Sequence, residues 1–172
     1  MRTYQRALRC AWRALQPTNK SWHSLLSRNA TLTINAYCNS QNIMAAQYTL
    51  KVLTEFAAAH QLHNYPGNCA RMHGHNWKVE VEVTGSQLDQ VGMVTDFKTM
   101  KKAAKAVADR LDHFYLNDIP PFDCINPTAE NLAAWFYREV GLLLNNEHAH
   151  VSAVTLWETD RACVTYRETS AR

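Results

Sequence analysis

Residues 69–84 read CARMHGHNWKVEVEVT, and this stretch decides the fold of the chain. From position 77 onward apolar and polar residues alternate strictly, which is typical of a strand with one buried and one solvated face. Because side chains alternate along a strand, counting back by twos places His75 and His73 on the apolar face. Gly74 stands between them, and its missing side chain allows another backbone or a ligand to come close.

A second strand is predicted over residues 47–60, shortly before this stretch in the chain. Its even positions are mostly apolar and lead to His60 at its end. His60, His73 and His75 are therefore expected at strand ends on the apolar face, where an imidazole lacks hydrogen-bond partners. A single histidine in such a place is usually a satisfied core residue, but three from adjacent strands favour a metal site.

The ligand set suggests the kind of metal site. Three histidines with an open fourth position are typical of catalytic zinc, whereas structural zinc is usually closed by several cysteines. The residues indicate a metalloenzyme in which Cys69 acts as a nucleophile or base near the metal. A closed structural site, with Cys69 as the fourth ligand, is the simpler alternative.

The rest of the chain predicts two helices and then two strands. The predicted elements are a helix over 97–111 with Asp96 as its N-cap, a helix over 127–144 with Asn126 as its cap, and strands over 151–158 and 161–167. Strands at both ends with helices between them favour an α+β fold, an antiparallel sheet in β-β-α-α-β-β order with two helices on one face. The other face has no helix to cover it, so assembly with further copies of the chain is expected.

A carboxylate and an imidazole stand side by side at the predicted end of the first helix, in Leu111-Asp112-His113. A neighbouring carboxylate can orient an imidazole and stabilise its protonated form, which serves acid–base chemistry. The alternative is a surface helix end, where His113 interacts favourably with the helix dipole.

Glu158 lies on the apolar face of its predicted strand, together with Val154 and Leu156. A carboxylate there must be paired or must await a ligand. Its two oxygens match the adjacent N–H donors of a 2-amino-4-oxo pterin as well as those of a guanidinium. An internal partner, Arg161 or Arg167, is therefore the alternative to a ligand.

Charge is distributed unevenly along the chain. Residues 1–46 hold six Lys/Arg and no Asp/Glu, whereas 47–172 hold twelve Lys/Arg and fifteen Asp/Glu. The positive net charge of the whole chain is therefore no argument for a nucleic-acid partner, since the part expected to fold is slightly acidic. Five scattered cysteines predict no disulfide framework and fit a cytoplasmic location. No apolar run of transmembrane length is present, so no membrane partner is expected.

The first 43 residues do not read as a globular domain, because they are acid-free and are interrupted at Pro17. Met44 lies shortly before the first predicted strand, which favours an extension over 1–43 that results from a mis-assigned start. A transit peptide or a disordered extension is the alternative. A single domain is predicted over 44–172.

Taken together, these features resemble the 6-pyruvoyltetrahydropterin synthase superfamily, and within it most the bacterial 6-carboxytetrahydropterin synthases of queuosine biosynthesis. The resemblance covers about Gln47 to Glu168. It rests on Phe56 to His60, Cys69-x-x-x-His73-Gly74-His75, Gly92-Met93-Val94-x-Asp96-Phe97, Leu111-Asp112-His113, Leu116-Asn117, Pro127-Thr128-x-Glu130-Asn131-Leu132 and Glu158.

The resemblance implies a tunnelling fold, in which several copies close their sheets into a barrel, usually as a homohexamer with active sites between subunits. It implies that His60, His73 and His75 bind Zn²⁺. It further implies catalytic roles for Cys69, Asp112 and His113, and substrate contacts from Glu158, which anchors the pterin, and from Thr128.

The activity implied by the resemblance is a zinc-dependent lyase reaction on 7,8-dihydroneopterin triphosphate. The products would be 6-carboxy-5,6,7,8-tetrahydropterin, acetaldehyde and triphosphate. The three-residue spacer between Cys69 and His73 resembles the carboxytetrahydropterin enzymes. Two alternatives remain: a 6-pyruvoyltetrahydropterin synthase that uses the same substrate, and a non-catalytic zinc- or pterin-binding protein. Binding alone needs none of the three catalytic candidates.

Overall fold

A computed structural model describes residues 46–169 of the chain. Its elements in chain order are β1 (Tyr48–His60), the 3₁₀ turn η1 (Asn68–Ala70), β2 (His73–Gly85), α3 (Phe97–Ala108), the 3₁₀ turn η2 (Leu116–Asp118), α4 (Ala129–Leu144), β3 (Ala149–Thr159) and β4 (Ala162–Tyr166). The strands form one antiparallel sheet in the order β1-β2-β3-β4. The predicted α+β class and element order are confirmed. The predicted extension over 1–43 lies outside the described residues and stays a prediction.

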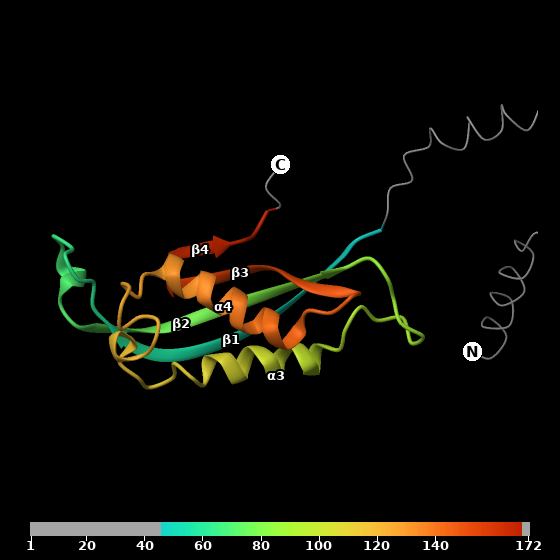
Figure 1. Cartoon of the computed structure of the whole chain (residues 1–172), viewed down its shortest axis with the longest axis horizontal. Coiled ribbons are helices and arrows are strands. Elements are labelled where there is room, and N and C mark those ends of the chain that lie inside the picture. The colour runs from blue at the N-terminus through green and yellow to red at the C-terminus, as the bar shows by residue number, and fades with distance from the viewer. Residues whose placement is uncertain (1–45, 170–172) are drawn as a thin grey trace, which may run out of the picture. The chain divides into compact units, whose positions relative to one another are not determined.

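Both helices lie on the same face of the sheet, as Figure 1 shows. The core between the layers begins with the inward side chains of β2, since Trp77, Val79, Val81 and Val83 are all fully buried. Apolar stripes of the two helices complete it with Met100, Ala104 and Val107 of α3 and Leu132, Phe136 and Val140 of α4. The alternating pattern of β2 therefore does bury the face that leads to His73 and His75.

The helix boundaries differ from the predicted ones. Asp96 caps α3 as expected, because its carboxylate accepts the N–H of Lys98 at 2.9 Å. The helix ends at Ala108 and not at 111, since the N–H groups of residues 110 and 111 donate to carbonyls three residues back and tighten the last turn. The Asp112–His113 pair therefore lies beyond the helix, and its interpretation as a dipole-stabilised helix end is wrong.

The cap of α4 is Thr128 and not Asn126. The Thr128 hydroxyl oxygen accepts the N–H of Asn131 at 3.2 Å, and the helix begins at Ala129. Pro127 thus precedes the cap and is not the first helical residue. The amide of Asn126 is free for a different role, because it binds the backbone of His63.

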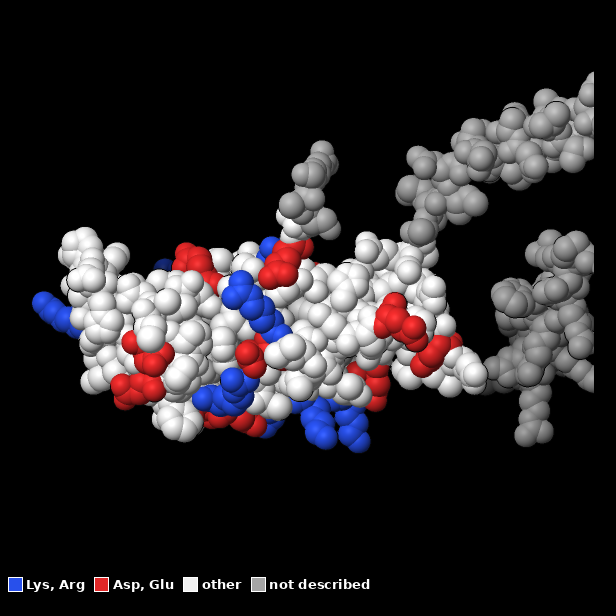
Figure 2. Space-filling view, in the orientation of Figure 1, with Lys and Arg blue, Asp and Glu red and all other residues white. Residues whose placement is uncertain are grey.

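The sheet face opposite the helices is polar. Lys51 of β1 bridges Glu80 and Glu82 of β2 at 2.9 and 2.8 Å, and Arg167 approaches Glu82 at 3.7 Å. No helix of residues 46–169 covers this face, in agreement with the predicted one-sided architecture. On the surface shown in Figure 2, basic side chains gather along the edge of the molecule where α3 runs, and the four lysines of α3 are exposed. Within the same residues, neither helix is long and apolar enough to cross a bilayer.

Candidate metal centre and its surroundings

Three histidines converge where β1 ends and β2 begins. The register pairs His60 with His73 and Ala58 with His75, so all three imidazoles project from the helix-covered face. Their ring centroids are 4.5 Å apart for His60 and His73, 5.2 Å for His60 and His75, and 4.9 Å for His73 and His75. The grouping predicted from strand alternation is confirmed.

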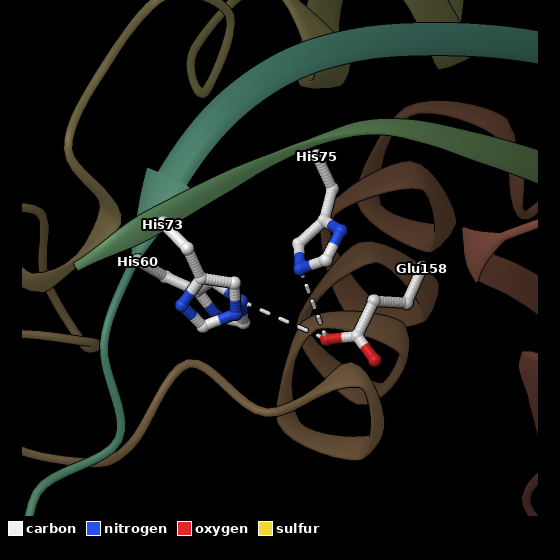
Figure 3. Close-up of side chains that lie close together, drawn as sticks. All are labelled: His60, His73, His75 and Glu158. Carbon is white, nitrogen blue, oxygen red and sulfur yellow. Dashed lines mark ion pairs between the residues drawn. The ribbon is translucent and has the colours of Figure 1, made fainter. Parts of the chain in front are cut away.

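Glu158 of β3 completes a four-residue group with these histidines (Figure 3). Its Oε1 atom lies 3.6 Å from both His60 Nε2 and His75 Nε2. One possible ligand atom from each of the four residues lies within 4.8 Å of the other three. Since tetrahedral zinc with nitrogen and oxygen ligands at roughly 2.0–2.2 Å needs ligand atoms a little over 3 Å apart, the group fits a metal ion of this kind.

A β-bulge delivers Glu158 to this place. Trp157 pairs with Cys163 and Thr159 pairs with Ala162, which leaves Glu158 as the extra residue on β3. A bulge bends its strand and re-aims the side chain that it carries. Among residues 46–169 the nitrogen atoms close to the Glu158 carboxylate belong to His60 and His75, each at 3.6 Å, whereas Arg167 approaches Glu82. The alternative of an internal arginine partner is therefore wrong.

Two backbone carbonyls determine which ring nitrogens face the metal position. His60 Nδ1 lies 2.8 Å from the carbonyl oxygen of Pro127, and His73 Nδ1 lies 2.8 Å from that of Arg71. A carbonyl only accepts, so each Nδ1 carries the proton and each Nε2 is left bare. The Nε2 atoms of His60 and His75 are buried, and neither has a hydrogen-bond partner in the described part of the chain. Bare, buried imidazole nitrogens in a cluster are the donor set of a metal site.

Burial also favours the neutral, ligating form of two of these rings. Burial lowers the pKa of His60, which is 1% exposed, although its bond to the Pro127 carbonyl acts in the opposite direction. Burial likewise lowers the pKa of His75, against the opposing effect of the Glu158 carboxylate. Both imidazoles are therefore held in the state that binds a cation.

Cys69 lies in η1, within the loop that joins β1 to β2 at the metal end. Its thiol is free and half-buried, and its carbonyl accepts the N–H of Leu62 at 2.8 Å. The described residues that group around the metal position are the three histidines and Glu158, without Cys69. The structure thus does not form the closed site in which Cys69 is the fourth ligand.

The Asp112–His113 pair is bound to the outer edge of β1. Asp112 Oδ1 accepts the N–H of Ala57 at 2.8 Å, and the N–H of His113 donates to the Ala57 carbonyl at 2.6 Å. Asp112 Oδ2 lies 3.0 Å from His113 Nδ1, so the expected pairing is formed. The Ala57 N–H, followed by the imidazole of His113, lowers the pKa of Asp112.

An open cavity of about 520 Å³ lies beside this pair, lined by residues 57–59, 74–76 and 113–115. Strand alternation directs Ala57 and Asn76 away from the three histidines, toward the uncovered face. The side chain of His113 is 82% exposed. It is therefore available to a molecule that binds on that face.

Sequence reasoning missed the carbonyls of Arg71 and Pro127, because every residue has a carbonyl and none leaves a side-chain signal. It also missed that the side chains of Asn117 and Asn126 hold the chain that follows His60, since it interpreted Asn126 as a helix cap. The motif Leu116-Asn117 pointed to Asn117, but the sequence analysis gave this residue no role.

Comparison with known proteins gives concordant results. A sequence family described as 6-pyruvoyl tetrahydropterin synthase matches residues 49–169. A 6-carboxy-5,6,7,8-tetrahydropterin synthase of Synechocystis is 39% identical over 90 residues, which cover 49% of this chain and 68% of the relative. A 6-pyruvoyl tetrahydrobiopterin synthase of Dictyostelium discoideum is 33% identical over 103 residues, which cover 59% and 74%. The solved structure of Caenorhabditis elegans 6-pyruvoyl tetrahydropterin synthase superposes with a TM-score of 0.66 at 28% identity, over 72% of this chain and 97% of that one.

Proposed function

Because the chain belongs to the 6-pyruvoyl tetrahydropterin synthase family and is thus a tetrahydropterin synthase, we propose that it is the zinc-dependent lyase of queuosine biosynthesis. It would convert 7,8-dihydroneopterin triphosphate and one molecule of water to 6-carboxy-5,6,7,8-tetrahydropterin, with release of acetaldehyde and triphosphate. The observation that carries the proposal is the convergence of three histidines, of which His60 and His75 have buried Nε2 atoms without a hydrogen-bond partner among residues 46–169. Several bacterial relatives bear the name of this enzyme.

His60, His73 and His75 are the residues that would hold the zinc ion. When bound, zinc would supply Lewis-acid polarisation of side-chain oxygens of the substrate. The fit is supported by the donor set, since neutral imidazoles are good zinc ligands and the Nε2 atoms of His60 and His75 have no hydrogen-bond partner among residues 46–169.

Glu158 is proposed as the pterin anchor. Its carboxylate is 33% exposed and has no arginine partner in residues 46–169, so its two oxygens can receive the adjacent N–H donors of the pterin. Thr128 is proposed as a second contact, since it follows Pro127, whose carbonyl binds His60. Its hydroxyl oxygen accepts the Asn131 N–H, which leaves the hydroxyl proton to donate. These contacts would orient the pterin side chain for reaction.

Proton transfer is assigned to Cys69 and to the Asp112–His113 pair. A thiolate at Cys69, favoured by a nearby cation, would remove or deliver a proton at a side-chain carbon of the substrate. Asp112 would hold His113 through Nδ1, at 3.0 Å, and leave Nε2 to exchange a proton with a substrate hydroxyl. Binding alone needs none of Cys69, Asp112 and His113, so the presence of all three argues against a protein that only binds.

Assembly into a barrel, as a homohexamer, is part of the proposal. In the described sheet β1 and β4 are edge strands, and the stretches of an edge that no other segment pairs are templates for pairing with another chain. Ala57 and Asn76 line the cavity beside His113 and face the side without helices. A neighbouring copy on that side would reach His113, so that one active site draws on more than one chain. The cytoplasmic location remains a proposal based on the scattered cysteines.

The test is to incubate zinc-loaded protein with 7,8-dihydroneopterin triphosphate and to identify the products by mass spectrometry. The proposal expects 6-carboxytetrahydropterin together with acetaldehyde. A 6-pyruvoyl product would show the second candidate function, which the Dictyostelium relative and the Caenorhabditis structure favour by name. If the protein bound pterin but formed neither product, the catalytic assignment would be wrong.

A further inference from the structure

The outer edge of β1 is paired at every second residue near the metal centre, although β1 is an edge strand of the described sheet. At Ala57 the partners are the Asp112 carboxylate and the His113 N–H. At Ala59 the N–H donates to the Phe114 carbonyl at 3.1 Å. Past His60, the next such bonds of the chain, at Gln61 and His63, are made by other residues.

Two asparagine side chains take over at this point. Asn117 Oδ1 accepts the N–H of Gln61 at 3.0 Å, and Asn117 Nδ2 donates to the Gln61 carbonyl at 3.0 Å. Asn126 Oδ1 accepts the N–H of His63 at 2.7 Å, and Asn126 Nδ2 donates to the His63 carbonyl at 3.0 Å. Each carboxamide therefore satisfies both backbone groups of one residue, as a neighbouring strand would do.

Asn126 also fixes the chain on its own C-terminal side. Its backbone carbonyl oxygen accepts the N–H of Thr128 at 2.8 Å and the side-chain amide N–H of Asn131 at 2.9 Å. Between these bonds lies Pro127, whose carbonyl receives the Nδ1 proton of His60 at 2.8 Å. Asn126 thus ties the segment after His60 to the acceptor that determines the tautomer of His60.

We propose that Asn126, supported by Asn117 and Asn131, is a positioning residue for the metal ligand His60. It holds the 61–63 segment and the Pro127 carbonyl in mutual register, which keeps the imidazole proton on Nδ1 and presents Nε2 to the metal. This inference rests on the proposed zinc site and adds to it a residue that does not touch the metal.

The physical consequence of losing this amide follows from the contacts. Asn126→Ala removes both bonds to His63 and lets the Pro127 carbonyl move relative to β1. His60 would then sample orientations and tautomers in which Nε2 is not available, and metal binding would have to select the competent one. Removal of a partner that orients a metal-bound histidine typically weakens metal affinity by about 10- to 100-fold.

Asn146 provides a matched control at the other end of β3. Its side chain also holds loop backbone, because it accepts the N–H groups of His148 at 2.9 Å and Ala149 at 3.0 Å and donates to the Leu144 carbonyl at 3.3 Å. Asn146→Ala therefore deletes a comparable set of bonds far along the sheet from His60. It separates a general loss of stability from an effect on the metal.

The experiment measures the zinc dissociation constant of the full-length chain by competition with a chelator, and the visible absorption spectrum after cobalt substitution. Asn126→Ala is expected to bind zinc about 10- to 100-fold more weakly and to shift the cobalt bands, whereas Asn146→Ala keeps both at wild-type values. Wild-type affinity in Asn126→Ala, or equal weakening in both variants, would overturn the inference.

If Asn126→Ala does not fold, Asn131→Ala decides the question. It removes only the bond to the Asn126 carbonyl, and alanine is a good helix former at this position in α4. A several-fold loss of zinc affinity supports the inference, and an unchanged affinity overturns it. If wild-type protein binds no zinc, the proposed function and the inference both fall; if it binds zinc and the variants do so equally well, only the inference falls.

Discussion

Glu158→Gln tests the assignment of the pterin anchor most directly. The substitution keeps the size of the side chain but replaces one acceptor by a donor, which would face the N–H donors of the ligand. Loss of a hydrogen bond to a charged group costs about 1.5–3 kcal/mol. Since the Glu158 side chain is 33% exposed, part of this loss is recovered from water. We therefore expect pterin to bind roughly 10- to 100-fold more weakly.

The assay is a fluorescence titration of zinc-loaded wild type and variant with the pterin, together with a measurement of bound zinc per chain. Glu147→Gln is the control, because that carboxylate is 82% exposed and its ion pair is with His148. An unchanged pterin dissociation constant in Glu158→Gln would refute the anchor. Loss of zinc would refute it as well, since the 3.6 Å approach of Glu158 to two histidines would then reflect metal ligation.

Four further predictions concern the metal, the thiol, the acid–base pair and the fold. His75→Ala should lose bound zinc and activity together, and full zinc retention would contradict the metal site. Cys69→Ala should keep zinc but lose about a hundredfold to ten-thousandfold of turnover; loss of zinc would instead make Cys69 a ligand. The pKa of Asp112 is lower in the folded chain than its unfolded value of 3.8. The ionised carboxylate therefore stabilises the fold above that pKa, and the stabilisation disappears as the pH falls through the folded-state pKa. Thermal melts of wild type and Asp112→Asn should thus differ at neutral pH and converge in acid, and a constant difference would contradict this. Gly85→Ala should lower the free energy of unfolding, measured in urea, by about 1–3 kcal/mol. The added Cβ would lie 2.5 Å from Val94 Cγ1 and 2.7 Å from the His148 carbonyl oxygen. An unchanged urea midpoint would show that the neighbouring residues move to accommodate the methyl group.

The alternation of apolar and polar residues was sufficient to predict the faces of the strands and the meeting of three histidines. Side chains alternate between the two faces of a strand whatever its surroundings, so the spacing alone places His73 and His75 on the same face as the buried Trp77. Helical periodicity likewise predicted a helix over 97–111, of which Phe97–Ala108 forms α3. These properties depend on local backbone geometry, which the residues themselves determine.

The tertiary structure decided the features that join distant parts of the chain. The end of α3, the bulge at Glu158 and the bonds of Asn126 to His63 each depend on which backbone groups the folded chain brings into reach. The same holds for the Pro127 carbonyl, which meets His60 across 67 residues of sequence. Hydrogen bonds of this kind form between groups that every residue or many side chains possess. Their partners are therefore selected by three-dimensional proximity and leave no pattern in the sequence.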